Sequence, residues 1–476
     1  MDHQASRRRF LRNSLALATV LGNGLPLGMS EVRADGFAAL NHPFLANIML
    51  NGGPDMRHLL MPAFLSVEGS YGREFWRARV STQGGEDTAS ALDARWNANY
   101  LPANSGNTQF GILKEADWLH QMWSAGKVAV ICGVLNDSSR DHELAARMME
   151  MGNRQANKFS FGSGWGGRLA QATNSNVVAL TTSPRRFSFC PNPNAPQDLT
   201  RIDNRRLIPA ANMREIALAD PSPNSDYSGM DDKLKRGLKQ YYAQRRATVS
   251  RSSVYHQFFE HERKLRELGS VIDARLATVA TPPAIDAWFQ DGSEIGYDLA
   301  LQTRNLYDAL ACNDLLDIRV ASLDFNGWDT HNDQSTEFAT NAKALLGANG
   351  ALATLYNELG NLSNADVRAN TVFLLGGEFG RQLASNGGGG TDHGEGLISL
   401  LIGDSVQGGV YGTMFPEEEL ARFAEESAQI AGVNAIEHVF GRVAEWIMPG
   451  TKAQVFPNAS GAPLEAGLDL SGLFNA

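Results

Sequence analysis

Apolar runs and amphipathic stretches alternate along most of this chain, which predicts alternating strands and helices. Helical spacing of apolar residues marks 117–125, 143–151, 297–311 and an amphipathic segment over 338–359, and another helix begins near 163–169. Partly β-branched apolar runs predict buried strands at 44–50 (FLANIML), 127–133 (KVAVICG), 316–323 (LDIRVASL) and 371–375 (TVFLL). The last two strands flank a helix, which predicts a parallel pair with a right-handed crossover. The whole pattern favours an α/β fold in which a doubly wound, mostly parallel sheet is sandwiched between helices.

Two stretches depart from this alternation. Residues 190–230 are rich in proline, asparagine and aspartate and show little periodicity, which predicts a long surface excursion. Residues 234–276 have a charged helical pattern with few breakers, so we expect one or two long helices that cover the sheet or project from it. Neither stretch divides the pattern into separate cores, and we expect a single domain over 35–476.

The amino terminus has the features of an export signal. A twin arginine within 6–12 (SRRRFLR) precedes the apolar stretch 15–27, and Val32-Arg33-Ala34 suits a signal peptidase. The apolar stretch is too short and glycine-rich for a stable membrane span. We therefore expect 1–34 to be a twin-arginine signal peptide, cleaved after Ala34, that takes the chain to the periplasm or the medium. The alternative is a basic cytoplasmic amphipathic tail.

Composition and charge narrow the class of protein. Among the 476 residues, 43% are hydrophobic and 20% are charged, as in an ordinary globular protein. A formal net charge of −10, without a basic stripe, argues against nucleic-acid binding. The three cysteines, Cys132, Cys190 and Cys312, form no CxxC pair, so neither a disulfide framework nor a thiolate metal site is expected.

Acidic residues and histidines follow several of the predicted strands. Most stand at strand ends. The others stand after the strand 371–375, where the glycine run 387–390 leads to an adjacent aspartate and histidine. Since ligands bind at the carboxyl ends of strands in α/β sheets, these side chains predict a site for one or two divalent ions of zinc, calcium or manganese. The alternative is that Asp329 caps the following helix and His331 is a surface histidine. The candidate ligands are Asp55, Asp329, His331, Glu378, Asp392 and His393.

The order of these polar strand ends resembles the alkaline phosphatase and sulfatase superfamily. More closely, the chain resembles a bacterial family of exported, sulfatase-like proteins of unknown function, over about residues 45–450. The resemblance implies an alkaline-phosphatase-like domain, in which Glu378 matches a metal-binding aspartate and His393 a late metal-binding histidine. The matching motifs are NGGPD (51–55), SSRDH (138–142), GWGGR (164–168), GWDTH (327–331), GGEFGR (376–381), GGTDHG (389–394) and GGVYG (408–412).

The same resemblance suggests catalytic residues. A serine nucleophile, Ser138 or Ser139, would stand at a helix start, where the helix dipole favours an alkoxide and a bound oxyanion. Arg140 or Arg381 would hold the remaining oxygens. Alternatively SSRD is a helix N-cap, in which case Asp141 and His142 matter more than the serines. The candidate catalytic residues are Ser138, Ser139, His142 and Arg381.

Two activities are disfavoured by missing motifs. Cys190-Pro191 has no arginine at the offset of a formylglycine signature, and neither glycine-rich segment matches a nucleotide-binding loop. We expect a metal-dependent hydrolase or transferase acting on phosphate or sulfate esters, of small molecules or envelope polymers, and delivered by the twin-arginine export machinery. The alternative is a non-catalytic binding or envelope-assembly protein on the same fold.

Overall fold

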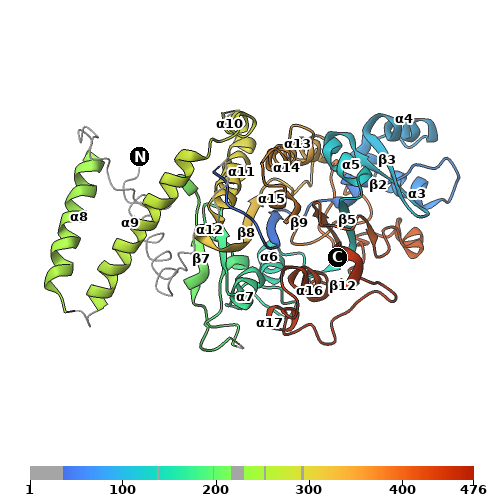
Figure 1. Cartoon of the computed structure of the whole chain (residues 1–476). Coiled ribbons are helices and arrows are strands. Elements are labelled where there is room, and N and C mark those ends of the chain that lie inside the picture. The colour runs from blue at the N-terminus through green and yellow to red at the C-terminus, as the bar shows by residue number, and fades with distance from the viewer. Residues whose placement is uncertain are drawn as a thin grey trace.

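A computed structural model of the chain describes residues 36–136, 139–196, 198–215, 230–250, 254–290 and 294–475. The predicted signal peptide with its cleavage site at Ala34 lies outside the described residues, and so does Ser138. The described chain forms an α/β structure around a nine-stranded mixed sheet (Figure 1). Its strands are β1 (Phe44–Leu50), β5 (Val128–Leu135), β6 (Asn176–Ala179), β7 (Leu207–Pro209), β8 (Ile318–Phe325), β9 (Thr371–Gly376), β10 (Leu397–Ile402), β11 (Gly409–Tyr411) and β12 (Asn434–Ala435).

The first strand of the chain lies at the centre of this sheet. The strand order is β11-β5-β10-β9-β1-β8-β6-β7, with β12 also paired to β5. Leu45 of β1 lies opposite Val320 on one side and Val372 on the other, both in parallel register. Strands β8 and β9 are therefore parallel, as expected, but β1 separates them, so they are not the adjacent pair that the sequence suggested.

Strand β10 makes the sheet mixed. It pairs antiparallel with both β9 and β5, whereas the other named pairs of this sheet are parallel. The chain reaches β10 directly from the long loop after β9, without a crossover helix. An antiparallel neighbour needs no such crossover.

Both faces of the sheet are buried under helices. Alternate side chains of each strand point to opposite faces, so each strand contributes to both apolar layers. In β1, Ile48 packs into one apolar cluster and Leu45 into another. The first cluster includes side chains of α5 (Asp117–Ser124), α11 (Glu294–Ala311), α13 (Gln334–Leu346) and α14 (Ala351–Gly360). The second includes α7 (Trp165–Ala172), α16 (Ile436–Ile447) and α17 (Lys452–Val455). The molecule is thus layered helix, sheet, helix (Figure 1).

Smaller elements complete the structure. A three-stranded antiparallel sheet, β2 (Leu60–Pro62), β4 (Thr108–Leu113) and β3 (Tyr100–Ser105), lies at one end of the molecule. The remaining helices are α2 (Met56–Leu59), α3 (Tyr71–Ala78), α4 (Ala89–Asn99), α6 (His142–Met151), α10 (Pro283–Gln290), α12 (Asn313–Leu316) and α15 (Ala365–Ala369). Short 3-10 turns occupy Val80–Gln83, Lys114–Ala116, Arg186–Ser188, Asn204–Arg206, Met213–Glu215, Glu417–Arg422 and Ser471–Leu473.

The helical insertion forms two long helices, α8 (Met230–Thr248) and α9 (Val254–Thr278). Figure 1 shows α8 projecting from the body, with α9 linking it to the rest of the molecule. Tyr242 packs on Phe259 with ring centroids 5.5 Å apart, whereas Ile272 near the end of α9 is buried in the main core. No helix among the described residues is long and apolar enough to cross a membrane.

Two local expectations need correction. The predicted surface excursion over 190–230 contains β7, a buried edge strand, because Leu207 and Ile208 extend the sheet beside β6. The amphipathic segment over 338–359 is two helices, and the chain between α13 and α14 turns at Gly347 and Gly350. All three cysteines are buried and free.

Candidate metal centre

Loops that follow four strands meet at one edge of the sheet. Strands β1, β8 and β9 are parallel, and β5 runs in the same direction because both β5 and β9 are antiparallel to β10. Their carboxyl ends therefore share an edge, the usual place for a ligand site in an α/β protein.

The loop after β1 packs closely against the loop after β8. The amide of Trp328 donates to the carbonyl of Asn51 at 3.1 Å. Gly52 has a φ of +120°, and a Cβ at this position would lie 2.3 Å from the amide nitrogen of Asp329. Only glycine allows this approach. The Gly52 amide in turn donates to Oε1 of Glu378 at 2.8 Å, so the loop also contacts the end of β9.

A buried tryptophan anchors the loop after β8. Trp328 packs edge-on against Phe338 of α13, with ring centroids 5.0 Å apart, and is almost fully buried. The next residue, Asp329, projects into the site with its carboxylate half-exposed, and His331 follows two residues later. The apolar anchor thus fixes the chain from which both polar side chains extend.

The chain after β9 makes an excursion from Gly380 to Gly394 that closes on itself. The amide of Gly394 donates to the carbonyl of Gly380 at 2.7 Å. Gly390 lies so close to the loop after β8 that an added Cβ would be 2.2 Å from the carbonyl carbon of His331. This close packing brings Asp392 and His393 beside His331.

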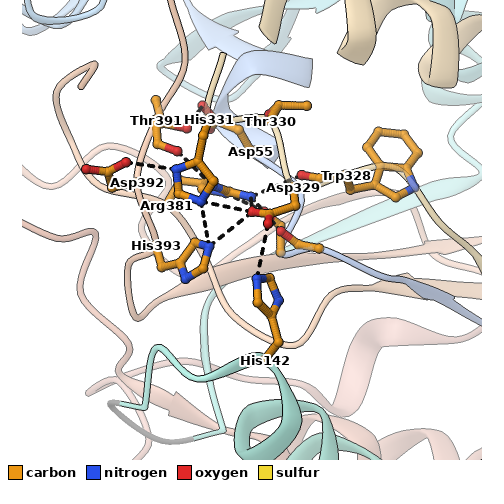
Figure 2. A network of polar contacts seen from close by, with 12 residues as sticks. Asp55, His142, Trp328, Asp329, Thr330, His331, Arg381, Thr391, Asp392 and His393 are labelled. Atoms are coloured by element: carbon orange, nitrogen blue, oxygen red, sulfur yellow. Dashed lines mark hydrogen bonds and ion pairs between the residues drawn. The ribbon is translucent and has the colours of Figure 1, made fainter. Parts of the chain in front are cut away.

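The loop after β5 supplies the remaining histidine. Asp141 caps α6, because its Oδ1 accepts from the amide of Leu144 at 2.9 Å. His142 is the first residue of the helix and points toward Asp329 (Figure 2). The cap therefore sets the position at which His142 leaves the backbone.

Three histidines converge on the carboxylate of Asp329 (Figure 2). Nε2 of His393 lies 3.0 Å from Oδ1, Nε2 of His331 lies 3.1 Å from the same oxygen, and these two nitrogens are 2.9 Å apart. Nε2 of His142 lies 3.3 Å from Oδ2. Ligand atoms of His142, Asp329 and His393 all fall within 4.8 Å of one another, a spacing that one metal ion can bridge.

The opposite ring nitrogen of each histidine has an acceptor. Nδ1 of His142 lies 2.7 Å from Oε1 of Glu378, and Nδ1 of His331 lies 2.8 Å from Oδ1 of Asp392. Nδ1 of His393 lies 3.0 Å from the carbonyl oxygen of Arg140. A carboxylate or carbonyl only accepts, so these partners assign the proton of each neutral ring to Nδ1.

This assignment leaves three unprotonated Nε2 atoms facing a carboxylate. Lone pairs of nitrogen and oxygen at such short distances repel one another unless a cation lies between them. Three imidazoles and one carboxylate, each imidazole oriented by an outer acceptor, are a typical donor set for a transition-metal ion. The residues present therefore fit a bound divalent ion.

The electrostatics of the site follow from burial and from Arg381. Burial would raise the pKa of Asp329, but the hydrogen bond from Arg381 and the adjacent ring of His393 outweigh it and lower this pKa to about 2. Partial burial lowers the pKa of His393, which favours the neutral ring. The hydrogen bond to Glu378 raises the pKa of His142, so this ring takes up a proton more readily as the pH falls.

Arg381 has a different position from the one expected. Its side chain is completely buried, and its guanidinium donates to Oδ1 of Asp329 at 2.8 Å. Further hydrogen bonds go to backbone carbonyls at the ends of three loops, those of Gly52, Gly53, Trp328 and Thr391. A buried side chain with these partners cannot hold substrate oxygens, so Arg381 positions the loops and Asp329 instead.

Asp55 is also placed differently. It is buried in an ion pair with Arg79, and its Oδ2 accepts from Nε2 of Gln334 at 2.8 Å. The described contacts join it to none of the three histidines. Because these contacts keep Asp55 apart from the three histidines, we leave it out of the ligand set.

The remaining candidates lie around the start of α6. Oγ of Ser139 accepts from the amide of Asp141 at 3.2 Å in the turn before α6, whereas Asp141 itself caps the helix. Arg140 is exposed, and its guanidinium makes no hydrogen bond or ion pair with the part of the chain that the structure describes. Of the two arginines considered, Arg140 is therefore the one that can reach a substrate.

Sequence reasoning gave His142 a catalytic role and Glu378 and Asp392 the role of ligands. In the structure His142 faces Asp329, while Glu378 and Asp392 contact the outer nitrogens of two histidine rings. No sequence pattern indicated that the carbonyl of Arg140 would orient His393. His142 could have been recognised as a member of the cluster, since it follows a capping aspartate in the segment after a predicted strand.

Comparison with known families gives one match. A family model described as "Protein of unknown function (DUF1501)" matches residues 116–427, more than half of the chain. The chain belongs to the DUF1501 family. The matched region of this DUF1501 protein includes every residue of the histidine cluster, while Asp55 and the loop after β1 precede it. No curated protein matches the sequence.

Proposed function

We propose that this DUF1501 protein is an exported, metal-dependent hydrolase or transferase acting on phosphate or sulfate esters. The observation that carries the proposal is the convergence of Nε2 of His142, His331 and His393 on the carboxylate of Asp329. The order of polar strand ends, in an α/β structure with helices on both faces of the sheet, supports an alkaline-phosphatase-like relationship.

The ligand set indicates the kind of ion. His142, Asp329, His331 and His393 would hold it, while Glu378 and Asp392 orient two of the rings. Calcium prefers six to eight oxygen ligands, whereas imidazole suits zinc and related transition metals. This nitrogen-rich set therefore favours zinc or manganese over calcium.

The surroundings of the cluster suit an anionic ester. When bound, the ion would supply Lewis-acid chemistry, offsetting negative charge on a phosphoryl or sulfuryl group. His142, His331 and Asp329 are only partly buried, so a substrate can approach them. The amino terminus of α6 and the exposed guanidinium of Arg140 both favour an oxyanion beside His142.

A serine is the proposed nucleophile. In the sequence, Ser139 stands three residues and Ser138 four residues before His142. Among the described residues, the hydroxyl of Ser139 has one hydrogen bond, from the amide of Asp141, and its lone pairs are not exhausted by it. That position supports Ser139 as one of the two candidates.

The alternative function is an exported binding or envelope-assembly protein in which the ion stabilises the loops. The observation in its favour is that the hydroxyl of Ser139 serves α6 as a turn partner and makes no described contact with the histidine cluster. An outcome with bound metal but no turnover would favour this alternative.

Metal content is the first test. The protein is purified without chelator, and zinc, manganese and calcium are measured by plasma mass spectrometry. We expect bound zinc or manganese in the wild type and in His120→Ala, which changes a partly exposed histidine away from the cluster. His331→Ala/His393→Ala should lose the ion while remaining folded. A folded wild type without metal would contradict the proposal.

Turnover is the second test. A panel of aryl phosphates and aryl sulfates is assayed with the metal-loaded wild type and with Ser138→Ala and Ser139→Ala. Loss of turnover with retained metal in one of the two variants would identify the nucleophile. Unchanged turnover in both would reject a serine nucleophile.

Export is tested separately. We propose that the twin-arginine pathway delivers the chain to the periplasm with cleavage after Ala34. Arg7→Lys/Arg8→Lys should leave the protein in the cytoplasm with its amino-terminal segment attached, as seen by cell fractionation and mass spectrometry. Periplasmic accumulation of this variant would exclude the proposed route.

A further inference from the structure

A loop with two exposed phenylalanines lies beside the candidate metal centre. This loop, residues 157–162, is called here the Phe159 loop. Lys158 forms an ion pair of 3.1 Å with Asp141, the capping residue directly before His142. Arg147, one turn into α6, donates to the carbonyls of Lys158 and Ser160. The loop is therefore attached to the helix that carries a proposed ligand.

The aromatic side chains of this loop are exposed in a way that folding does not require. Phe159 is 94% exposed and Phe161 is 57% exposed. Exposure of two phenylalanine rings to water within three residues is unfavourable, and rings so exposed do not stabilise the core. Their exposure suggests a partner that provides an apolar environment.

The loop holds its shape by hydrogen bonds of its own. The amide of Asn157 donates to Oγ of Ser160 at 2.8 Å, and the amide of Phe159 donates to Oδ1 of Asn157 at 2.9 Å. Ser163, directly after the loop, donates its amide to the carbonyl of Leu199 at 2.8 Å. The phenylalanines are thus presented on a preformed turn, which lowers the entropic cost of docking.

The surroundings of the two rings are cationic, in a chain of net charge −10. Lys158 is exposed and adjacent to Phe159, and the guanidinium of Arg186 lies 5.4 Å from the ring centre of Phe161. Arg140, two residues before His142, is exposed as well. Two acidic side chains, Asp141 and Glu143, pair with Lys158 and Arg147. Arg140 and Arg186 add positive charge to these pairs, so the apolar tips are complementary to the interface of an anionic lipid bilayer.

We propose that the Phe159 loop inserts into an anionic membrane surface and so presents the metal centre to esters in lipid headgroups. The docking follows from the loop itself, whereas the substrate class rests on the proposed function. Polysaccharide, by contrast, stacks on flat aromatic faces that line a groove, and a projecting turn with one almost fully exposed ring offers no such groove.

Vesicle binding tests the docking without any assay of turnover. A chain that begins at Asp35 keeps every described helix and strand and removes the apolar stretch 15–27, which would itself enter vesicles. Cosedimentation is measured with vesicles of phosphatidylglycerol mixed with phosphatidylcholine, and with phosphatidylcholine alone. We expect binding to the anionic vesicles that weakens at high salt.

Variants connect the binding to the loop. Phe159→Ser/Phe161→Ser should bind anionic vesicles at least about tenfold more weakly and keep the wild-type urea midpoint, because both rings are exposed. Tyr241→Ser is the matched control, since it removes a 53% exposed ring on α8, and it should bind like the wild type. His331→Ala/His393→Ala should lose metal yet keep vesicle binding, which separates this proposal from the proposed function.

Three outcomes would overturn the docking. They are a wild type that ignores anionic vesicles, a Phe159→Ser/Phe161→Ser variant that binds them like the wild type, and a variant whose only change is its oligomeric state in gel filtration. The last outcome would identify the loop as a contact between copies. The loop would be assigned to sugar recognition instead if the wild type bound a polysaccharide resin but no vesicles and Phe159→Ser/Phe161→Ser lost the binding to the resin.

Discussion

Asp392 accepts from Nδ1 of His331 at 2.8 Å, and the opposite nitrogen of that ring lies 3.1 Å from Asp329. The outer carboxylate determines both the tautomer and the orientation of the ring before any ligand arrives. The cluster is therefore preorganised by neighbours that would not contact an ion themselves.

Removal of this outer carboxylate should weaken metal binding without abolishing it. We expect Asp392→Ala to lower the affinity for zinc about 10- to 100-fold, because His331 loses the partner that orients it. Asp93→Ala, which changes an exposed aspartate on α4, should leave the affinity unchanged. Competition with a chromophoric chelator measures both variants. Equal affinities would show that His331 needs no outer partner.

A methyl group on Gly52 should displace the site. Its Cβ would lie 2.3 Å from the amide nitrogen of Asp329, so Gly52→Ala must push the loop after β8 outward. Gly106→Ala is the control, since that glycine also has a positive φ but faces open space, and should cost only about 1 kcal/mol. We expect the first variant to lose metal affinity and more stability than the control. Calorimetry and metal titration of both variants test this.

Arg381 should matter for stability even without metal. Arg381→Met leaves carbonyls of several loops without their donor and Asp329 without its partner, so the free energy of unfolding should fall by at least about 3 kcal/mol. Arg140→Met changes an exposed guanidinium and should stay within about 0.5 kcal/mol of the wild type. Urea unfolding in the presence of chelator gives both values. A small loss in Arg381→Met would mean that the loops hold together without it.

His58 should make stability depend on pH. Burial lowers its pKa from 6.5 to about 4, so between these values the unfolded chain binds a proton that the folded chain does not. Stability therefore falls as the pH decreases from 6.5 to 4, by about 3 kcal/mol from this residue. His58→Gln should remove that part of the pH dependence. Urea unfolding at several pH values compares the variant with the wild type, and parallel curves would contradict the prediction.

The elements that were predictable from the sequence are those whose own residues show a clear pattern. Strands β1 and β9 are apolar runs with a glycine at or shortly after the end, Gly52 and Gly376, and their predicted bounds agree with the structure to within a residue. Strands β6, β7, β11 and β12 have two to four residues each, too few for a periodicity to appear. The direction of β10 depends on which strands are already beside it, and no local pattern contains that information.

The candidate site was likewise predictable from the sequence only in part. The types of residue at strand ends indicated where Asp329, His331 and His393 would gather. Their division into ligands and outer partners depends on which ring nitrogen faces which neighbour, a three-dimensional property. The pairing of Asp55 with Arg79 likewise joins residues on different elements, without a motif that connects them.

The central place of β1 in the sheet has a consequence for the order of folding. Leu45 pairs with Val320 and Val372, so the first strand to leave the ribosome waits for partners made near the end of synthesis. Contacts between residues so distant in sequence slow folding, because the intervening chain must be brought together first. During translation the unpaired edges of β1 would be accessible to chaperones, and folding should be completed only after the chain is released.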